Sequence, residues 1–418
     1  MSNIKLENVR LLDPVEKIDL ITTVYLKNGK RVESLEHIDE NIDAQGKWLM
    51  PTMVDLCARV REPGQQQHGT LKSEGKAARE NGILHVITPP DSKPIVQDNG
   101  ALIHGLIEKA WTDGQFHLHI IGAQTQGLMG KQPANMAALK KGGCTAVSNA
   151  NASFEDDDVV IRTLEYAAGL GLTVVFYPEE AQIAKDGCVH EGFIASRQGL
   201  PMIPAIAETI AIAKYLIMIE ATGVRAHFGL ISSGKSIELI EAAKAKGLPV
   251  TADVAMHQLH LTESLIDGFN SLAHVRPPLR SEQDKQQLRQ AVKSGVIDAI
   301  CTHHEPLSSS AKMMPFAETL PGISAFDTYV ALGVQLVKEG LFEPLEWVEK
   351  VTIAPAQVAN MFERWQAEKG WVLVDPDLAW TAEKKSILSS GKNTPLLNQT
   401  LTGKVVPVSY THLTLPTS

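Results

Sequence analysis

The sequence predicts an α/β protein built on a (β/α)8 TIM-type barrel, with a small β-domain formed by the two ends of the chain. Two observations lead to this prediction. Between residues 51 and 362, short apolar runs alternate with stretches of helical periodicity, a pattern typical of parallel sheets. Residues 1–50 and 363–408 instead contain short strands separated by turns.

The small β-domain is expected from six runs rich in strand-forming residues. They are Ile4–Leu12, Asp19–Lys27, Arg31–Leu35, Trp48–Met50, Gly370–Val374 and Lys404–Val408. The dipeptide Asn28-Gly29 is typical of a two-residue hairpin turn between two of these runs. Residues 409–418 do not resemble a domain end, and we expect them to be a non-native or disordered tail.

Eight apolar runs form the expected barrel strands. They are Met53–Cys57, Ile83–Thr88, His117–Gly122, Cys144–Ser148, Thr173–Tyr177, Arg225–Leu230, Pro249–Val254 and Ile297–Thr302. Helical patterns separate them, among them Asp158–Leu170, Ile206–Ala221, Ser236–Lys246 and Glu282–Lys293. Eight strand–helix units favour a closed barrel. The alternative is a doubly wound open sheet, but no glycine-rich dinucleotide loop follows any of these strands.

Composition excludes several classes of protein. With 418 residues, 44% hydrophobic and 21% charged, the chain is not disordered, and four cysteines do not make a disulfide framework. The net charge of -9, without a long Lys/Arg run, argues against nucleic acid or an anionic membrane as partner. The N-terminus has no apolar signal core, and no run is long enough to span a membrane, so we expect a cytoplasmic protein.

Barrel enzymes place their chemistry where the strands end. Four short segments follow one another along the chain in an order that is typical of a known family. They are Arg61-Glu62-Pro63-Gly64, Pro277-Pro278-Leu279-Arg280, Ala354-Pro355-Ala356 and Asn393-Thr394-Pro395. Over nearly its whole length the chain thereby resembles the dihydroorotase branch of the amidohydrolase superfamily. The resemblance implies a barrel with a flanking β-domain. It also implies one or two zinc ions that activate water to open dihydroorotate or to close carbamoyl-aspartate.

The positions that hold zinc in this family carry other residues here. The two histidines of the first strand correspond to Cys57 and Arg59, the bridging carboxylate to Asn149, the histidines of strands five and six to Tyr177 and Leu230, and the aspartate general base of strand eight to His303. A guanidinium has no lone pair to donate. At ~4 Å it repels a divalent ion by several kcal/mol, even at an effective dielectric of ~20. We therefore expect no catalytic residue, no metal and no cofactor.

The positions that bind substrate in the family are only partly kept. Arg61 and His304 are present, whereas Asp91 and Arg276 replace asparagines. Asp91 repels a dianionic ligand and Arg276 attracts one, so binding of dihydroorotate is doubtful on charge alone. Arg61 also has a purely structural interpretation, in which its stem packs and its charge pairs with Glu62 or another local acid.

Two histidine pairs lie outside these positions. His117 and His119 share one face of the third strand, but at its start and hence at the opposite end of the barrel. We interpret them as buried or mutually paired histidines, with a displaced metal motif as the alternative. His257 and His260 are spaced to share one face of a helical turn, and we interpret them in the same way.

The resemblance therefore implies a noncatalytic dihydroorotase homologue. Some bacteria have such a chain as a structural subunit of aspartate carbamoyltransferase in pyrimidine biosynthesis, and six copies of each chain are expected. Two other hypotheses remain. One is an active cyclic-amide hydrolase with rearranged ligands: Cys57, His257, His303 and His304. The other is a binding module that holds a dicarboxylate through Arg61, Arg276 and His304.

Overall fold

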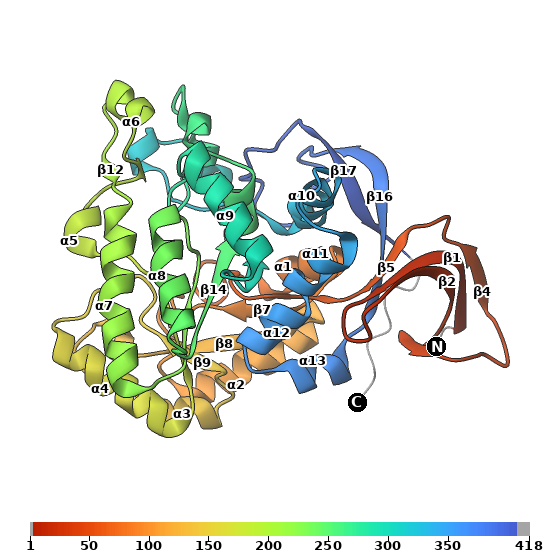
Figure 1. Cartoon of the computed structure of the whole chain (residues 1–418), viewed down its shortest axis with the longest axis horizontal. Helices are drawn as coiled ribbons and strands as arrows, with labels where there is room; N and C mark the ends of the chain where they lie inside the picture. The colour runs from red at the N-terminus through yellow and green to blue at the C-terminus, as the bar shows by residue number, and fades with distance from the viewer. Residues whose placement is uncertain (1–2, 408–418) are drawn as a thin grey trace.

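A computed structural model describes residues 3–407, so the predicted tail at 409–418 lies outside the described residues. Figure 1 shows a barrel with helices α4 (Asp157–Leu170), α7 (Ile206–Thr222) and α8 (Gly234–Ala245) on one flank. The small sheet that contains β1 (Asn3–Asp13) and β2 (Ile18–Lys27) lies on the opposite flank.

The eight predicted barrel strands are all present and parallel. In chain order they are β6 (Met53–Asp55), β7 (Ile83–Thr88), β8 (His117–Ala123), β9 (Ala146–Ser148), β10 (Thr173–Phe176), β13 (Ala226–Phe228), β14 (Val250–Ala255) and β15 (Ala299–Cys301). Each strand pairs with the one before it along the chain, so the order in the sheet follows the sequence. This regular order confirms the barrel and excludes the doubly wound alternative, in which the strand order reverses.

The barrel closes just beyond the ends of its first and last strands. Ala58, which follows β6, forms a parallel bridge with His304, which follows β15. The backbone N–H of Arg59 donates to the carbonyl of His304 at 2.8 Å, and Asp55 Oδ1 accepts from the backbone N–H of Thr302 at 2.9 Å. Closure therefore takes place at the mouth, where the strands end, and it fixes the backbone that carries the candidate site.

Helices follow the strands around the outside of the barrel. The predicted helical stretches correspond to α4, α7, α8 and α9 (Glu282–Ser294). The others are α1 (Leu71–Glu80), α2 (Gly100–Lys109), α3 (Met136–Lys141), α5 (Ala181–Ala184), α6 (Phe193–Gln198), α10 (Phe326–Lys338), α11 (Pro344–Val351), α12 (Ile353–Val358) and α13 (Phe362–Glu368). None of the helices in residues 3–407 is long and apolar enough to cross a membrane.

The second sheet joins both ends of the described chain. Its order is β17 (Thr400–Val406), β16 (Trp371–Thr381), β5 (Trp48–Pro51), β1, β2 and β3 (Lys30–Val32), and β4 (Glu40–Asp43) also pairs with β1. Asn28 and Gly29 both have positive φ angles of 52° and 74°, as the hairpin prediction requires. Helix α13 leads directly into β16, so it connects the barrel to this sheet.

Candidate functional site at the barrel mouth

The six replaced ligand positions lie buried at or just beyond the ends of barrel strands. Their exposed fractions are 0% for Cys57, 9% for Arg59, 3% for Asn149, 9% for Tyr177, 5% for Leu230 and 1% for His303. Since the mouth of a barrel is where its enzymes hold metal and substrate, the contacts of these side chains decide what the site can do.

Arg59 is held by two carboxylates within the mouth. Its Nε lies 2.9 Å from Asp91 Oδ2 and its Nη2 lies 2.6 Å from the same oxygen, while its Nη1 lies 3.0 Å from Glu305 Oε1. Burial lowers the pKa of Arg59, but the charges of Asp91 and Glu305 outweigh it and hold the pKa well above its usual value. A permanent cation, paired with two carboxylates, therefore stands where the family places a zinc ligand.

Apolar packing occupies another part of the mouth. Cys57, Tyr177 and Leu230 belong to one hydrophobic cluster inside the barrel. Burial raises the pKa of the Cys57 thiol far above its usual range, and it raises the pKa of the Tyr177 hydroxyl likewise. The thiol and the phenol are both neutral at pH 7, and only the deprotonated thiolate is a good metal ligand.

Of the two remaining positions, Asn149 is engaged in hydrogen bonds, whereas His303 keeps a free ring nitrogen, Nδ1, that has no hydrogen-bond partner among residues 3–407. Asn149 Oδ1 accepts from the Thr125 hydroxyl at 2.6 Å, and its Nδ2 donates to the Ala152 carbonyl at 2.9 Å. His303 stacks on His257 with ring centroids 5.5 Å apart. Burial, followed by the charge of Arg59, lowers the pKa of His303 to about 3, so this ring is neutral at pH 7.

Zinc does not fit these residues. A zinc site needs three or four converging donors. Of the six positions only His303 offers a free neutral imidazole, and the others carry a protonated thiol, a protonated phenol, an engaged amide, an aliphatic side chain and a guanidinium. The rearranged set of Cys57, His257, His303 and His304 is no better. Within residues 3–407, the one group of at least three His, Cys, Asp or Glu donor atoms that converge is His85, His117 and Glu368, at the other end of the barrel.

The arginines of the substrate-binding positions are also paired inside the protein. Arg61 Nε donates to the Pro306 carbonyl at 3.0 Å, and its Nη2 lies 3.7 Å from Glu305 Oε1. The structural interpretation named Glu62 or another local acid as the partner of Arg61, and the carboxylate next to its guanidinium is that of Glu305. Arg276 Nε lies 3.1 Å from both carboxylate oxygens of Glu179. Each of the two guanidinium groups therefore lies next to a carboxylate of the protein.

His304 contacts protein groups with both ring nitrogens. Its Nδ1 accepts from the backbone N–H of Ala325 at 3.0 Å, so its Nε2 carries the proton and donates to Glu74 Oε2 at 3.0 Å. The ring stacks on Phe326 with centroids 3.7 Å apart, and its exposed fraction is 0%. In this structure His304 joins the last barrel strand to α1, and it offers no atom to a ligand in the mouth.

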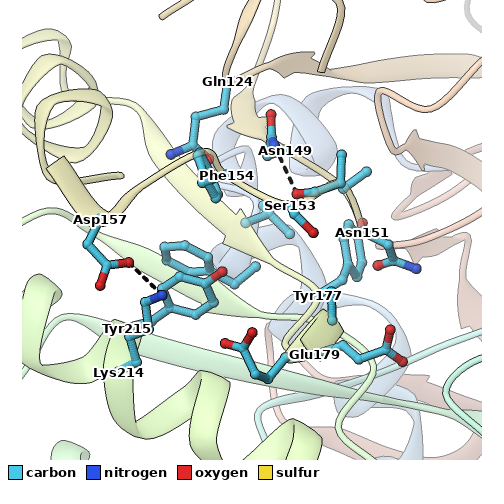
Figure 2. Close-up of a pocket in the computed structure, with 16 residues that line it drawn as sticks. Gln124, Asn149, Asn151, Ser153, Phe154, Asp157, Tyr177, Glu179, Lys214 and Tyr215 are labelled. Carbon is cyan, nitrogen blue, oxygen red and sulfur yellow. Dashed lines mark hydrogen bonds and ion pairs between the residues drawn. The ribbon is translucent and has the colours of Figure 1, made fainter. Parts of the chain in front are cut away.

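A polar pocket lies beside the ends of β9 and β10 (Figure 2). Its lining includes Asn149, Tyr177 and Glu179, together with side chains of α4 and α7. Figure 2 also shows the ion pair between Asp157 and Lys214, whose atoms lie 2.5 Å apart at its edge. The pocket carries more acidic than basic side chains, so it does not suit a dicarboxylate.

Sequence reasoning found the positions of the site but not its ion pairs. It identified Arg59, Asp91 and Arg276 separately, and it missed Glu305, Glu179 and Glu74 as partners. One signal was available for Glu305, because this acidic residue directly follows the two histidines at the end of the last strand.

Solved structures share this fold. L-hydantoinase from Arthrobacter aurescens superimposes with a TM-score of 0.83 at 18% identity, over 97% of this chain and 94% of that chain. Dihydropyrimidinase from Brevibacillus agri gives a TM-score of 0.78 at 18% identity, over 97% and 93%. The barrel with its flanking sheet is thus the amidohydrolase fold.

Sequence relatives give the family within that class. The family model "Dihydro-orotase-like" matches residues 46–236. A "Dihydroorotase-like protein" from Pseudomonas aeruginosa is 38% identical over 411 residues, and a "Dihydroorotase" from Trichlorobacter lovleyi is 32% identical over 410 residues. Each alignment covers 96% of both chains. The chain belongs to the dihydroorotase-like family of the amidohydrolase superfamily, as its motifs predicted.

Proposed function

We propose that this chain is a noncatalytic, cytoplasmic member of the dihydroorotase-like family that acts as a structural subunit of an aspartate carbamoyltransferase complex in pyrimidine biosynthesis. The observation that carries the proposal is the contact of Arg59 with Asp91 and Glu305 in the barrel mouth. A metal ion cannot enter this position unless a buried, doubly paired guanidinium leaves it.

The charge balance of the mouth supports the same proposal. Arg59 and Arg61 face Asp91 and Glu305, and Arg276 faces Glu179. Three guanidinium groups therefore meet three carboxylates. Because a dianionic substrate such as carbamoyl-aspartate needs uncompensated positive charge, this mouth has little to attract it.

We expect no interconversion of carbamoyl-aspartate and dihydroorotate by the purified protein, with or without added zinc. The physical reason is that the mouth has neither the donors to hold zinc nor an ionised general base, since His303 replaces the aspartate. The measurement is a spectrophotometric assay in both directions at micromolar enzyme, with the Trichlorobacter lovleyi dihydroorotase as a positive control.

Two outcomes of that experiment would replace the proposal by an alternative. Turnover that disappears in the His257→Gln and His303→Gln variants identifies an active hydrolase with rearranged ligands. Absent turnover with calorimetric binding of carbamoyl-aspartate that is lost in Arg276→Gln identifies a binding module. Absence of both turnover and binding leaves the noncatalytic subunit.

The surface of α7 supports a role in assembly. Ile206, Ile210 and Ile217 are 54%, 39% and 70% exposed, and their spacing of four and seven residues places them along one face of the helix. Several large apolar side chains along one exposed helix face are typical of an interaction surface.

We expect this chain to co-purify with the aspartate carbamoyltransferase of its own organism as one large particle. The measurement is co-expression with an affinity tag on one chain only, followed by size-exclusion chromatography with light scattering. A mass equal to six copies of each chain confirms the stoichiometry as well. Separate peaks at micromolar concentration of both chains would contradict the proposed partnership.

A further inference from the structure

The end of the barrel opposite the mouth contains a cluster of histidines. His85 is the third residue of β7 and His117 is the first residue of β8, and the two residues are partners in the strand ladder. His119 follows two residues later on β8. Glu368, the last residue of α13, reaches the same place. We call His85, His117, His119 and Glu368 the floor cluster.

The donor atoms of the floor cluster lie close together. His85 Nδ1 is 3.1 Å from His119 Nε2, His117 Nδ1 is 3.5 Å from Glu368 Oε2, and His85 Nδ1 is 4.0 Å from the same oxygen. A tetrahedral zinc ion with bonds of about 2.0–2.1 Å places its donors about 3.3 Å apart. His85, His117 and Glu368 each place one donor atom within 4.8 Å of the other two, and His119 lies outside this set but next to His85.

The surrounding residues hold the rings in place. His117 stacks between the ring of His85, at 4.6 Å, and that of Trp111, at 4.8 Å. His85 has no exposed surface, and its Nε2 has no hydrogen-bond partner among residues 3–407. Burying three imidazoles side by side is costly unless their polar atoms are used. A hydrogen bond between His85 and His119 uses only part of this capacity.

The protonation state favours metal binding. Burial lowers the pKa of His85, of His117 and of His119, the last to about 3, so all three rings are neutral at pH 7. Each therefore keeps a lone pair for a ligand. The side chains of Glu368 and His117 are 29% and 14% exposed, so the cluster borders solvent at these two residues.

We propose that the floor cluster binds one zinc ion, with His85, His117 and Glu368 as ligands and with His119 completing the set when it gives up its contact with His85 Nδ1. Imidazole nitrogens favour zinc over magnesium or calcium, which prefer oxygen donors. The ion is structural. It ties α13, and through it β16 of the small sheet, to strands β7 and β8 of the barrel. This inference does not depend on the proposed loss of zinc from the mouth.

Arg364 allows a test that separates a metal site from a cluster without a metal, because the two predict different effects of removing its charge. Its Nε lies 3.1 Å from Glu368 Oε2 and 3.2 Å from Oε1, so it competes with a cation for this carboxylate. Because Arg364 is 50% exposed, it can turn toward solvent when an ion binds. Removing its charge in Arg364→Gln therefore strengthens zinc binding.

The test is equilibrium binding of zinc chloride to the full chain, by calorimetry and by metal analysis after gel filtration. We expect one zinc per chain and a rise in the thermal unfolding midpoint on saturation. His117→Gln and Glu368→Gln lower the affinity by at least about tenfold, and Arg364→Gln raises it. The matched control is His104→Gln, because His104 and Glu108 form an exposed pair, 3.4 Å apart, and belong to no converging group of three donors in the described part of the chain.

Two results would overturn the inference. One is the absence of stoichiometric zinc binding in a chain that circular dichroism shows to be folded. The other is binding that is unchanged in His117→Gln and in Glu368→Gln. If zinc binding is lost instead in Cys57→Ser or His303→Gln, the ion lies in the mouth, and that result contradicts the proposed function as well. Binding at the floor without turnover supports both proposals.

Discussion

Replacing Arg59 with methionine is expected to lower the free energy of unfolding by about 3–5 kcal/mol, the usual cost of breaking a buried ion pair from one side. The side chain of Arg59 is 11% exposed, and so is that of Glu305, while that of Asp91 is 29% exposed. Without the guanidinium, the carboxylates of Asp91 and Glu305 lose the cation that both of them contact. Chemical denaturation at pH 7 measures the loss.

A second variant, R59M/D91N, tests whether the loss of stability comes from the carboxylate that is left without its cation. In the double variant R59M/D91N, the carboxylate that depends most on Arg59 is gone, whereas Glu305 keeps Arg61 at 3.7 Å. We expect it to recover more than half of the lost stability. The matched control is Arg162→Met, whose ion pair with Asp158 at 2.7 Å is exposed at both ends and is worth at most about 1 kcal/mol.

A loss below about 1 kcal/mol in R59M would mean that Arg59 is not the residue that fills the mouth. The same variant also examines the proposed function. If the guanidinium were the only obstacle to metal binding, R59M would bind zinc in the mouth. We expect it not to do so, because Leu230 and the protonated Cys57 thiol still occupy ligand positions.

The sequence predicted the barrel well because its signal is repeated eight times. Each strand is buried on both faces, and so it appears as a short apolar run between helical stretches. The predicted strands were longer than the observed ones in several places; for example, Arg225–Leu230 contains the strand Ala226–Phe228. Leu230 has a φ angle of 61° and leaves the strand geometry to donate its N–H to Asp253. Apolar composition alone does not reveal such a turn.

Short elements with little periodicity were missed. Strand β4 (Glu40–Asp43) is polar and partly exposed, and it carries no alternation of buried and exposed apolar residues. The strands β11 (Val189–His190) and β12 (Met202–Ile203) have two residues each. Because a strand this short is defined by its partner rather than by its own sequence, no local pattern could have predicted it.

The candidate site shows the same limit in another form. The positions of Cys57, Arg59 and His303 followed from the order of the motifs, since strand ends converge in any barrel. Their contacts did not follow. Arg59 and Asp91 are 32 residues apart in the chain, and only the geometry of neighbouring strand ends brings them together. Arg276 was interpreted as a charge available to a ligand, whereas the fold pairs it with Glu179.

Glu74 is expected to be the other residue on which the stability of the mouth depends most. It lies on α1 with an exposed fraction of 0%. Its carboxylate accepts hydrogen bonds from His304 Nε2 at 3.0 Å, from the Ser389 hydroxyl at 2.6 Å and from the Ser390 backbone N–H at 3.0 Å. One side chain thus joins the first barrel helix, the last barrel strand and the C-terminal segment.

We expect Glu74→Gln to lower the free energy of unfolding by at least about 3 kcal/mol at pH 7. A glutamine has one acceptor oxygen and directs its NH2 at groups that are themselves donors. Each buried donor left without an acceptor costs about 1–3 kcal/mol. The matched control on the same helix is Glu80→Gln, because the ion-pair partner of Glu80 within residues 3–407 is Lys76, at 3.8 Å.

The effect of Glu74 has a defined pH dependence. Burial on its own raises the pKa of this carboxyl, but the hydrogen bond and charge of His304 and the hydrogen bonds of the serines outweigh it, so the net pKa is lowered. A carboxyl whose pKa is lower in the folded state stabilises the protein above its unfolded pKa of about 4.3, and it loses this contribution as the pH falls through the folded value. The stability difference between the wild type and Glu74→Gln should therefore be largest near pH 7 and shrink below about pH 4. A difference that stays constant from pH 7 to pH 3 would show that Glu74 acts through its shape and not through its charge, and would remove the carboxylate from the interactions that hold the mouth together.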